Sequence, residues 1–326
     1  MLIVTGAARF IPSCLIARLN AANFNDIIAV DDFRARPDKA PNLAGKRIRA
    51  FVERTELWAW LAANHEQVEF VFHLGARTDT TETDRGLLTE LNLAYSQRLW
   101  KECCRYHLPL VYASSAATYG AGELGYSDED DGLPTLLHPL NPYGDSKNDF
   151  DKWALVQPVK PFFWAGLKFF NVYGPNEYHK GRMASVVFHA VNQLRAGGPV
   201  KLFRSHRPEW ADGGQRRDFV YVKDVVDACL HLMLTRRGAG LYNLGSGTAH
   251  SFRELAEAVF AAAETPVNIQ YIDMPPDIRD TYQYFTEAPM AKLRRLTGYD
   301  QPFTSLEAGI ADYVRHYLLS GPRRYW

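Results

Sequence analysis

Short apolar runs alternate with helical patterns through the first half of this 326-residue chain, and this alternation strongly constrains its fold. Each run is too short and too continuously apolar for a surface helix, so it predicts a buried strand. Strand–helix alternation of this kind predicts a parallel sheet with helices on both faces. The predicted strands are Leu2–Val4, Ile27–Val30, Val68–Leu74 and Leu108–Ala113, and the predicted helices are Leu15–Asn20, Glu56–Ala63 and Leu87–Tyr106.

The alternation of apolar runs and helical patterns changes after residue 173, which predicts a second, smaller lobe. Ser251 and Glu254 have the spacing of a capping box at the start of a helix. We expect an α/β, doubly wound parallel-sheet (Rossmann-type) lobe over 1–172, with returns near 219–245, and a smaller interleaved α/β substrate lobe over 173–218 and 246–326. The elements expected there are a helix Ala184–Arg195, a loop-rich stretch Pro199–Gln215, a strand and helix Phe219–Leu234, a strand Leu241–Leu244, a helix Ser251–Ala263, a strand Asn268–Ile272 and a helix Leu306–Leu319.

Composition excludes several classes of protein. The chain carries 37 basic and 37 acidic side chains, so a broad nucleic-acid surface is not expected. No apolar run approaches the ~20 residues of a membrane helix. Cys14, Cys103, Cys104 and Cys229 lack the spacing of a metal site, and they indicate reduced thiols. Because the opening residues also lack a secretory pattern, we expect a cytoplasmic protein without a metal.

The turn after the first strand occupies the place of a dinucleotide-binding glycine turn. Gly6 begins it, and Asp31 and Asp32 end the second strand, about where a carboxylate would bind the adenosine ribose. The second and third glycines of the motif are replaced by Arg9 and Pro12. The position therefore predicts a nicotinamide cofactor, whereas the composition of the turn does not fully agree.

The two replacements leave three interpretations open. Pro12 is tolerable in a first helical turn, where its missing N–H has no helical partner. Arg9 either obstructs the diphosphate of the cofactor or swings aside and pairs with it as a cation. The third interpretation is an ordinary strand-to-helix turn that binds nothing.

A serine, a tyrosine and a lysine have the spacing of a proton-transfer site. Ser115 follows the strand Leu108–Ala113, and Tyr143 and Lys147 are four residues apart, which places them on one face of a helix. A phenol with a pKa near ~10 is a poor base at neutral pH, but a neighbouring ammonium group favours the phenolate. The three side chains therefore predict proton transfer coupled to hydride transfer at a nicotinamide.

The motifs resemble those of the extended short-chain dehydrogenases/reductases that act on nucleotide sugars. The resemblance runs from Met1 to the last helix, and it rests on Tyr112–Gly120, Phe170–Ser185 and Arg217–Val222. The narrowest part, His179-Lys180-Gly181 with Met183-Ala184-Ser185, resembles the ADP-L-glycero-D-manno-heptose 6-epimerase family. It implies an isomerase that inverts C6 of the heptose by transient oxidation, serves lipopolysaccharide core synthesis and forms a homo-oligomer.

The resemblance also implies which residues hold the cofactor. The family implies NADP, and Arg34, Arg36 and Lys39 are candidate partners for its 2′-phosphate. Asp32 opposes this because a second carboxylate repels a phosphate, and NAD is the alternative. The implied cofactor-binding residues are Gly6, Phe10, Ile11, Asp31, Asp32, Lys39, His73, Leu74, Gly75, Ala76, Arg77, Asn92, Tyr143, Lys147 and Val172.

For the substrate, the resemblance implies that Lys180 is a second acid/base group, so that Ser115, Tyr143, Lys147 and Lys180 are catalytic. The alternative is that Lys180 only neutralises a substrate phosphate. Residues 180–217 carry eight cations and two anions, which suits a sugar diphosphate but also suits a solvated surface. The implied substrate-binding residues are Asn171, Lys180, Arg182, His189, Lys201, Leu202, Phe203, Arg204, Arg217 and Tyr282.

Two other functions remain open at this point. One is a related nucleotide-sugar 4-epimerase or dehydratase. The other is a cofactor-impaired relative that binds ADP-sugar without catalysis, which the replacements at Arg9 and Pro12 would explain. The stretch Ser205–Gln215 contributes either loop structure or further substrate contacts.

Overall fold

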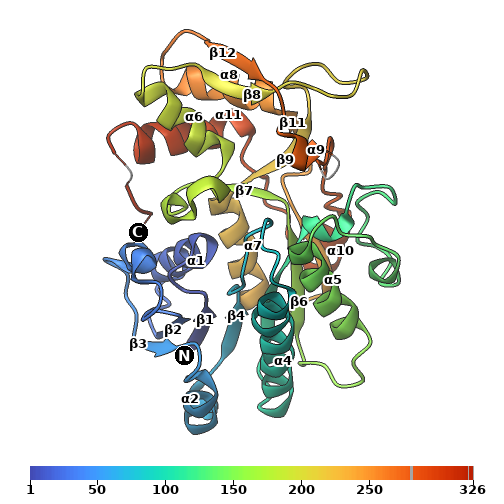
Figure 1. The fold of residues 1–326 in the computed structure, drawn as a ribbon. Coiled ribbons are helices and arrows are strands. Elements are labelled where there is room, and N and C mark those ends of the chain that lie inside the picture. The colour runs from blue at the N-terminus through green and yellow to red at the C-terminus, as the bar shows by residue number, and fades with distance from the viewer. Residues whose placement is uncertain (280–281, 322, 326) are drawn as a thin grey trace.

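A seven-stranded parallel sheet with the order β10-β6-β5-β4-β1-β2-β3 forms the centre of the computed structural model, which describes residues 1–279, 282–321 and 323–325 (Figure 1). The chain order reverses between β1 and β4, so the switch point of this Rossmann-type sheet lies at their carboxyl ends, where ligands bind. Its strands are β1 (Leu2–Thr5), β2 (Ile27–Asp31), β3 (Ala50–Glu53), β4 (Phe70–His73), β5 (Leu110–Ser115), β6 (Trp164–Phe169) and β10 (Gly240–Leu244).

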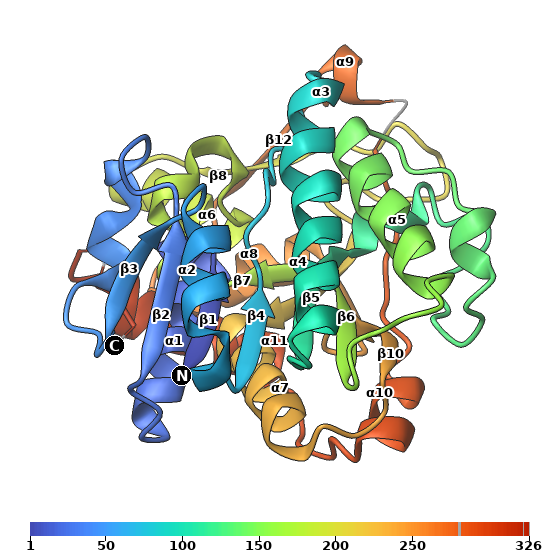
Figure 2. The ribbon, with the colours of Figure 1, turned by 90° about the horizontal axis from the view of Figure 1, so that it is seen from below.

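Helices cover both faces of this sheet (Figure 2). Successive residues of β1 point to opposite faces. Ile3 packs in one core with Trp100 of α4, and Val4 packs in the other with Ile16 of α1 and Val226 of α7. The helices of the first face are α2 (Leu57–Asn64), α4 (Tyr95–Arg105) and α5 (Pro142–Leu155), and those of the second are α1 (Phe10–Ala21) and α7 (Val222–Thr235). The predicted doubly wound α/β fold is confirmed.

The second half of the chain adds two small sheets, seen above the main sheet in Figure 1. One sheet joins β7 (Asn171–Tyr173), β9 (Arg216–Tyr221) and β11 (Ala249–Ser251), and the other joins β8 (Val200–Phe203) and β12 (Ile269–Ile272). The further helices are α3 (Arg85–Leu88), α6 (Val186–Arg195), α8 (Phe252–Ala262), α9 (Pro276–Arg279), α10 (Ala291–Thr297) and α11 (Leu306–Tyr313). The capping box of Ser251 and Glu254 is present at the start of α8.

The structure differs from the sequence-based expectation in three places. The stretch expected to be loop-rich, Pro199–Gln215, contains β8, because β8 finds a partner in the distant β12. The strand expected near Phe219 belongs to the three-stranded sheet, whereas α7 and β10 return to the main sheet. The long helix expected over Leu87–Tyr106 is divided by a π-helical turn at Thr89–Ala94. The division into two lobes stays a prediction.

Candidate active site

A cavity of about 780 Å³ is lined by the carboxyl end of β5, by α5 and α6, and by residues of β7, β8 and β9. It therefore touches both the main sheet and the smaller sheets. Sixteen of the residues implied by the sequence line it: Phe10, Ile11, Leu74, Ala76, Ser115, Tyr143, Lys147, Asn171, Val172, Lys180, His189, Lys201, Leu202, Phe203, Arg217 and Tyr282.

A smaller cavity of about 60 Å³ lies at the ends of β1 and β2. Gly6, Asp31, Asp32, Gly75 and Arg77 line it, as the sequence implies for a cofactor site. Arg54, which the sequence reasoning missed, lines it as well. Its signal was its place directly after a strand of the sheet, but that strand, β3, was not predicted. Arg9 and Ala76 line both cavities.

The glycine turn keeps glycine where the backbone needs it. Gly6 has φ +66°, and a Cβ atom there would lie 2.6 Å from the Cα atom of Gly75. Arg9 is the N-cap of α1, and Pro12 is the third residue of the helix, where a missing N–H is tolerated. Gly6 packs directly against Gly75, with no room for a side chain between β1 and the end of β4. This close turn, together with cavities on both sides of Arg9, is compatible with a dinucleotide that extends from one cavity to the other.

The cations proposed for a 2′-phosphate are engaged by carboxylates. Lys39 is buried and donates to Asp31 at 2.6 Å, and Asp31 also accepts the backbone N–H of Ala8 at 2.9 Å. Burial lowers the pKa of Lys39, which Asp31 opposes. Arg34 pairs with Glu56 at 2.9 Å, and Arg36 pairs with Asp38 at 2.8 Å. Lys39 thus pairs with Asp31, the carboxylate expected at the adenosine ribose, and lines neither cavity.

The predicted serine, tyrosine and lysine meet in the larger cavity. Asn141 caps α5 by accepting the backbone N–H of Gly144 at 2.8 Å, which begins the helix just before Tyr143. Lys147 follows one turn later and donates to the carbonyl of Ala113 at 2.8 Å. Burial lowers the pKa of Lys147 to about 8. Burial raises the pKa of Tyr143, and a hydrogen bond with Ser115 opposes this rise.

A buried ion pair between Asp151 and Lys168 links α5 to β6, and the sequence reasoning did not identify it. Asp151 lies two turns after Tyr143 on the same face of α5, and its carboxylate accepts from Lys168 at 2.8 Å, Ser114 at 2.6 Å and Tyr112 at 3.0 Å. The charge of Asp151 opposes the fall in the pKa of Lys147. The spacing Tyr143, Lys147, Asp151 was the available signal, since residues four apart share a helix face.

Lys180 enters the larger cavity from the segment Tyr178–Met183, a 3₁₀ helix that is kinked at Gly181. Its Nζ atom lies 5.2 Å from the ring centroid of Phe10. Burial lowers the pKa of Lys180, and the charge of Glu177 opposes this fall. A lysine whose pKa is lowered in this way is suited to exchange a proton.

Arg217 and Tyr282 lie together on the cavity wall. The guanidinium carbon of Arg217 is 5.2 Å from the ring centroid of Tyr282, and the group donates to the carbonyl oxygens of Arg216, at 2.9 Å, and Gln283. Burial lowers the pKa of Arg217. A buried guanidinium without a carboxylate partner in the described part of the chain is suited to an anionic ligand.

Comparison with known proteins decides the family. The model of the NAD dependent epimerase/dehydratase family matches residues 2–245, which is more than half of the chain. The chain belongs to this family. A relative from Fusobacterium nucleatum, described as ADP-L-glycero-D-manno-heptose-6-epimerase, is 46% identical over 98% of each chain. A relative of the same description from Nitratidesulfovibrio vulgaris is 45% identical over 98% of each chain.

Solved structures agree with this placement among the epimerases. The Helicobacter pylori ADP-L-glycero-D-manno-heptose-6-epimerase has a TM-score of 0.78 and 27% identity, and the match covers 97% of this chain and 95% of that one. The Thermus thermophilus UDP-glucose 4-epimerase, solved as a complex with NAD, has a TM-score of 0.74 and 28% identity, with 97% and 98% covered.

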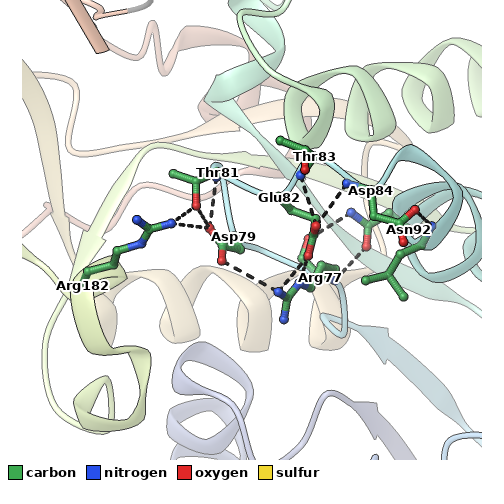
Figure 3. A network of polar contacts seen from close by, with 9 residues as sticks. Arg77, Asp79, Thr81, Glu82, Thr83, Asp84, Asn92 and Arg182 are labelled. Carbon is green, nitrogen blue, oxygen red and sulfur yellow. Dashed lines mark hydrogen bonds and ion pairs between the residues drawn. The ribbon is translucent and has the colours of Figure 1, made fainter. Parts of the chain in front are cut away.

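Arg182 and Arg204 lie outside the cavity lining in this member of the epimerase/dehydratase family. The side chain of Arg182 is 71% exposed, and Figure 3 shows it directed at Thr81 and Asp79, with Arg77 on the other side of Asp79. Arg204 pairs with Asp273 at 3.2 Å. Of the eight cations over 180–217, only Lys180, Lys201 and Arg217 line the cavity, so most of that charge run is surface.

Asn92 and His73, which the resemblance implies as cofactor-binding residues, line neither cavity of this epimerase-family site. Asn92 accepts the backbone N–H of Arg77 at 2.7 Å and donates to Ser146 at 2.9 Å, which ties the loop after β4 to α5. His73 lies between Thr5 and Ser96, with both contacts at 2.8 Å. Burial lowers the pKa of His73 to about 3, so the ring is neutral and holds the ends of β1 and β4 together.

No helix in the described ranges is long and apolar enough to cross a membrane. Those same ranges contain no group of three or more histidine, cysteine or carboxylate side chains that could hold a metal ion. In a polar cluster at β10, Asp128 accepts the backbone N–H of Asn243 at 2.8 Å, and Lys292 donates to the backbone carbonyl of Asp128 at 2.5 Å. The side chain of Asn243 donates to the carbonyl of Tyr126, and burial raises the pKa of Asp128.

Proposed function

We propose that this protein is an ADP-L-glycero-D-manno-heptose 6-epimerase that inverts C6 of the heptose by transient oxidation and reduction. The observation that carries the proposal is that Tyr143 and Lys180 line one cavity together with Arg217. An epimerase that acts on both configurations of an alcohol uses acid/base groups on two sides of the reacting carbon, and a nucleotide-sugar substrate needs a cation for its diphosphate. The identity of 46% to the Fusobacterium relative supports this substrate over a hexose.

Each side chain has a role in this proposal. A dinucleotide held beside Gly6 and Asp31 would supply reversible hydride transfer at C6. Tyr143 accepts the proton of the C6 hydroxyl, and Ser115 donates a hydrogen bond to the same oxygen. Lys147 favours the phenolate of Tyr143 by its charge. Lys180 gives or takes the proton when the C6 oxygen lies on the other side of the cavity.

Turnover of the proposed substrate tests this function. We expect purified protein to convert ADP-D-glycero-D-manno-heptose to the L-glycero isomer, followed by proton NMR of the C6 hydrogen, and to leave UDP-glucose unchanged. Inversion of a UDP-hexose without turnover of the ADP-heptose would show a 4-epimerase instead. Absence of NADP and NAD from the denatured protein, with no binding on titration, would contradict any epimerase function. A homo-oligomer in the cytoplasm that supplies lipopolysaccharide core synthesis completes the proposal.

The cofactor we propose is NADP, and Arg54 supports it. Arg54 lines the small cavity beside Asp31 and Asp32, and no carboxylate among the described residues lies within 4.0 Å of its guanidinium group. A phosphate on the adenosine ribose would meet this cation and offset the repulsion from the two carboxylates.

Replacing Arg54 with glutamine is therefore expected to weaken NADP⁺ binding about tenfold, because one charge-assisted hydrogen bond is lost. NAD⁺ binding should change less than twofold, since NAD⁺ has no 2′-phosphate. Calorimetric titration of both dinucleotides into cofactor-free protein measures the two affinities. A wild-type protein that prefers NAD⁺, or an Arg54→Gln variant with unchanged NADP⁺ affinity, would contradict the assignment.

A further inference from the structure

Arg9 stands at the junction of the two cavities without a counter-ion. Its side chain lines both cavities. Its charge interacts with the carboxylates of Asp31 and Asp32 and with the cations Arg36 and Arg77. Among the side chains that the structure describes, no carboxylate comes within 4.0 Å of its guanidinium group. Burial lowers the pKa of Arg9; the charges of Arg36 and Arg77 add to this fall, and those of Asp31 and Asp32 oppose it. An arginine remains charged under such conditions, so the group is a partly buried cation without an ion-pair partner among the described side chains.

The start of α1 has fewer donors than a helix start ordinarily offers. The N–H of Arg9 already donates to the carbonyl of Gly6 at 2.8 Å, and Pro12 has no N–H. The N–H of Ser13 donates to the carbonyl of Arg9 at 3.0 Å. Phe10 and Ile11 are thus the residues of the first turn whose N–H groups are left for an anion. The guanidinium of Arg9, with five N–H donors, lies beside this depleted helix end.

We propose that Arg9 is a ligand of the cofactor diphosphate, and that its guanidinium supplies donors that the altered glycine turn no longer provides. A dinucleotide that reaches from Asp31 to Tyr143 passes Arg9, since this side chain and Ala76 line both cavities. The guanidinium then moves out of the junction and binds the diphosphate through paired N–H donors. This inference rests on the dinucleotide-binding part of the proposed function and not on the identity of the sugar.

Titration of cofactor-free protein tests the proposal through binding alone. The ligands are NADP⁺ and 2′-AMP, which shares the adenosine 2′-phosphate but lacks the diphosphate. For Arg9→Met, which keeps much of the side-chain length and removes the charge, we expect NADP⁺ to bind at least tenfold more weakly and 2′-AMP to bind within twofold of wild type. Arg9→Lys keeps the charge but loses the paired N–H donors of the guanidinium, so its NADP⁺ affinity should lie between those of wild type and Arg9→Met. The NADP⁺ affinity of Arg9→Met should also depend less on salt concentration.

The matched control is Arg18→Met, the same substitution on the same helix. Arg18 pairs with Asp227 of α7 and lines neither cavity, so its NADP⁺ affinity should equal that of wild type. Unchanged NADP⁺ binding by Arg9→Met would overturn the proposal, and tighter binding would show in addition that Arg9 obstructs the site. An equal loss of 2′-AMP binding would also overturn it, because the effect would not depend on the diphosphate.

The outcomes also separate this inference from the proposed function. If wild-type protein binds neither NADP⁺ nor NAD⁺, both the inference and the proposed function fail. If NAD⁺ alone binds, the same comparison is made with NAD⁺ against adenosine. If the dinucleotide binds and Arg9→Met weakens it, but ADP-heptose is not turned over, the proposed substrate is wrong and the role of Arg9 stands.

Discussion

Replacing Tyr143 with phenylalanine is expected to lower kcat about 10³-fold, within the range that one general acid–base group contributes. The phenol lies in the larger cavity one helical turn before Lys147, and the hydrogen bond with Ser115 and the charge of Arg9 both favour the phenolate. Phenylalanine retains the ring and removes only the proton-transferring oxygen. The variant should therefore fold and bind NADP⁺ as wild type does. Steady-state rates with the ADP-heptose and calorimetric titration with NADP⁺ measure the two quantities.

The pH profile distinguishes proton transfer from a structural role for this tyrosine. Burial places the pKa of Tyr143 above its ordinary value in the ligand-free protein. Below the pKa, the phenolate fraction rises tenfold for each pH unit, so kcat of the wild-type protein should rise with pH over the base limb of the profile. The residual rate of Tyr143→Phe should lack that limb. Tyr106→Phe, at the C-cap of α4 and outside the lining of both cavities, is the matched control and should keep the wild-type profile. A Tyr143→Phe variant that epimerised at the native rate would show that another group is the base.

Replacing Lys180 with methionine is the second large effect that we expect, with kcat lowered about 10²-fold and KM changed less than threefold. Methionine retains much of the apolar stem that packs near Phe10 and removes the ammonium group. If Lys180 exchanges a proton with the C6 oxygen, its loss slows the chemical step. If Lys180 only neutralises a substrate phosphate, its loss raises KM and leaves kcat nearly unchanged.

The split between kcat and KM therefore decides the role of Lys180. Lys101→Met on the exposed face of α4 provides the matched control, because it removes an ammonium group far from the cavity lining. Its kinetic constants should match those of wild type. A tenfold rise in KM with an unchanged kcat for Lys180→Met would assign Lys180 to phosphate binding.

The parts of the site that could be predicted depend on spacing that is local in sequence. Tyr143 and Lys147 are one helical turn apart, and Ser115 follows directly on an apolar run, so each of these two short patterns could be identified by itself. The predicted strands Leu2–Val4 and Ile27–Val30 correspond to β1 and β2 for the same reason, since buried parallel strands are apolar throughout.

The parts that could not be predicted depend on contacts between distant segments. Lys168 is Asp151's partner only because β5 and β6 pair beneath α5. Arg182 was expected at the substrate because it lies in a run of cations, but it contacts Thr81, 101 residues earlier. A run of cations in the sequence describes local composition, but it does not indicate which of those side chains line a cavity.

The cations of the larger cavity couple the binding of an anionic ligand to the stability of the protein. Arg9, Lys147, Lys180 and Arg217 all line it, and burial lowers the pKa of each. Without an anion, the folded chain bears the cost of four desolvated positive charges. A bound diphosphate removes part of that cost and adds its binding free energy to the free energy of unfolding. The folded state is thus thermodynamically linked to occupancy, and a dinucleotide retained between turnovers would serve as a structural component of this enzyme.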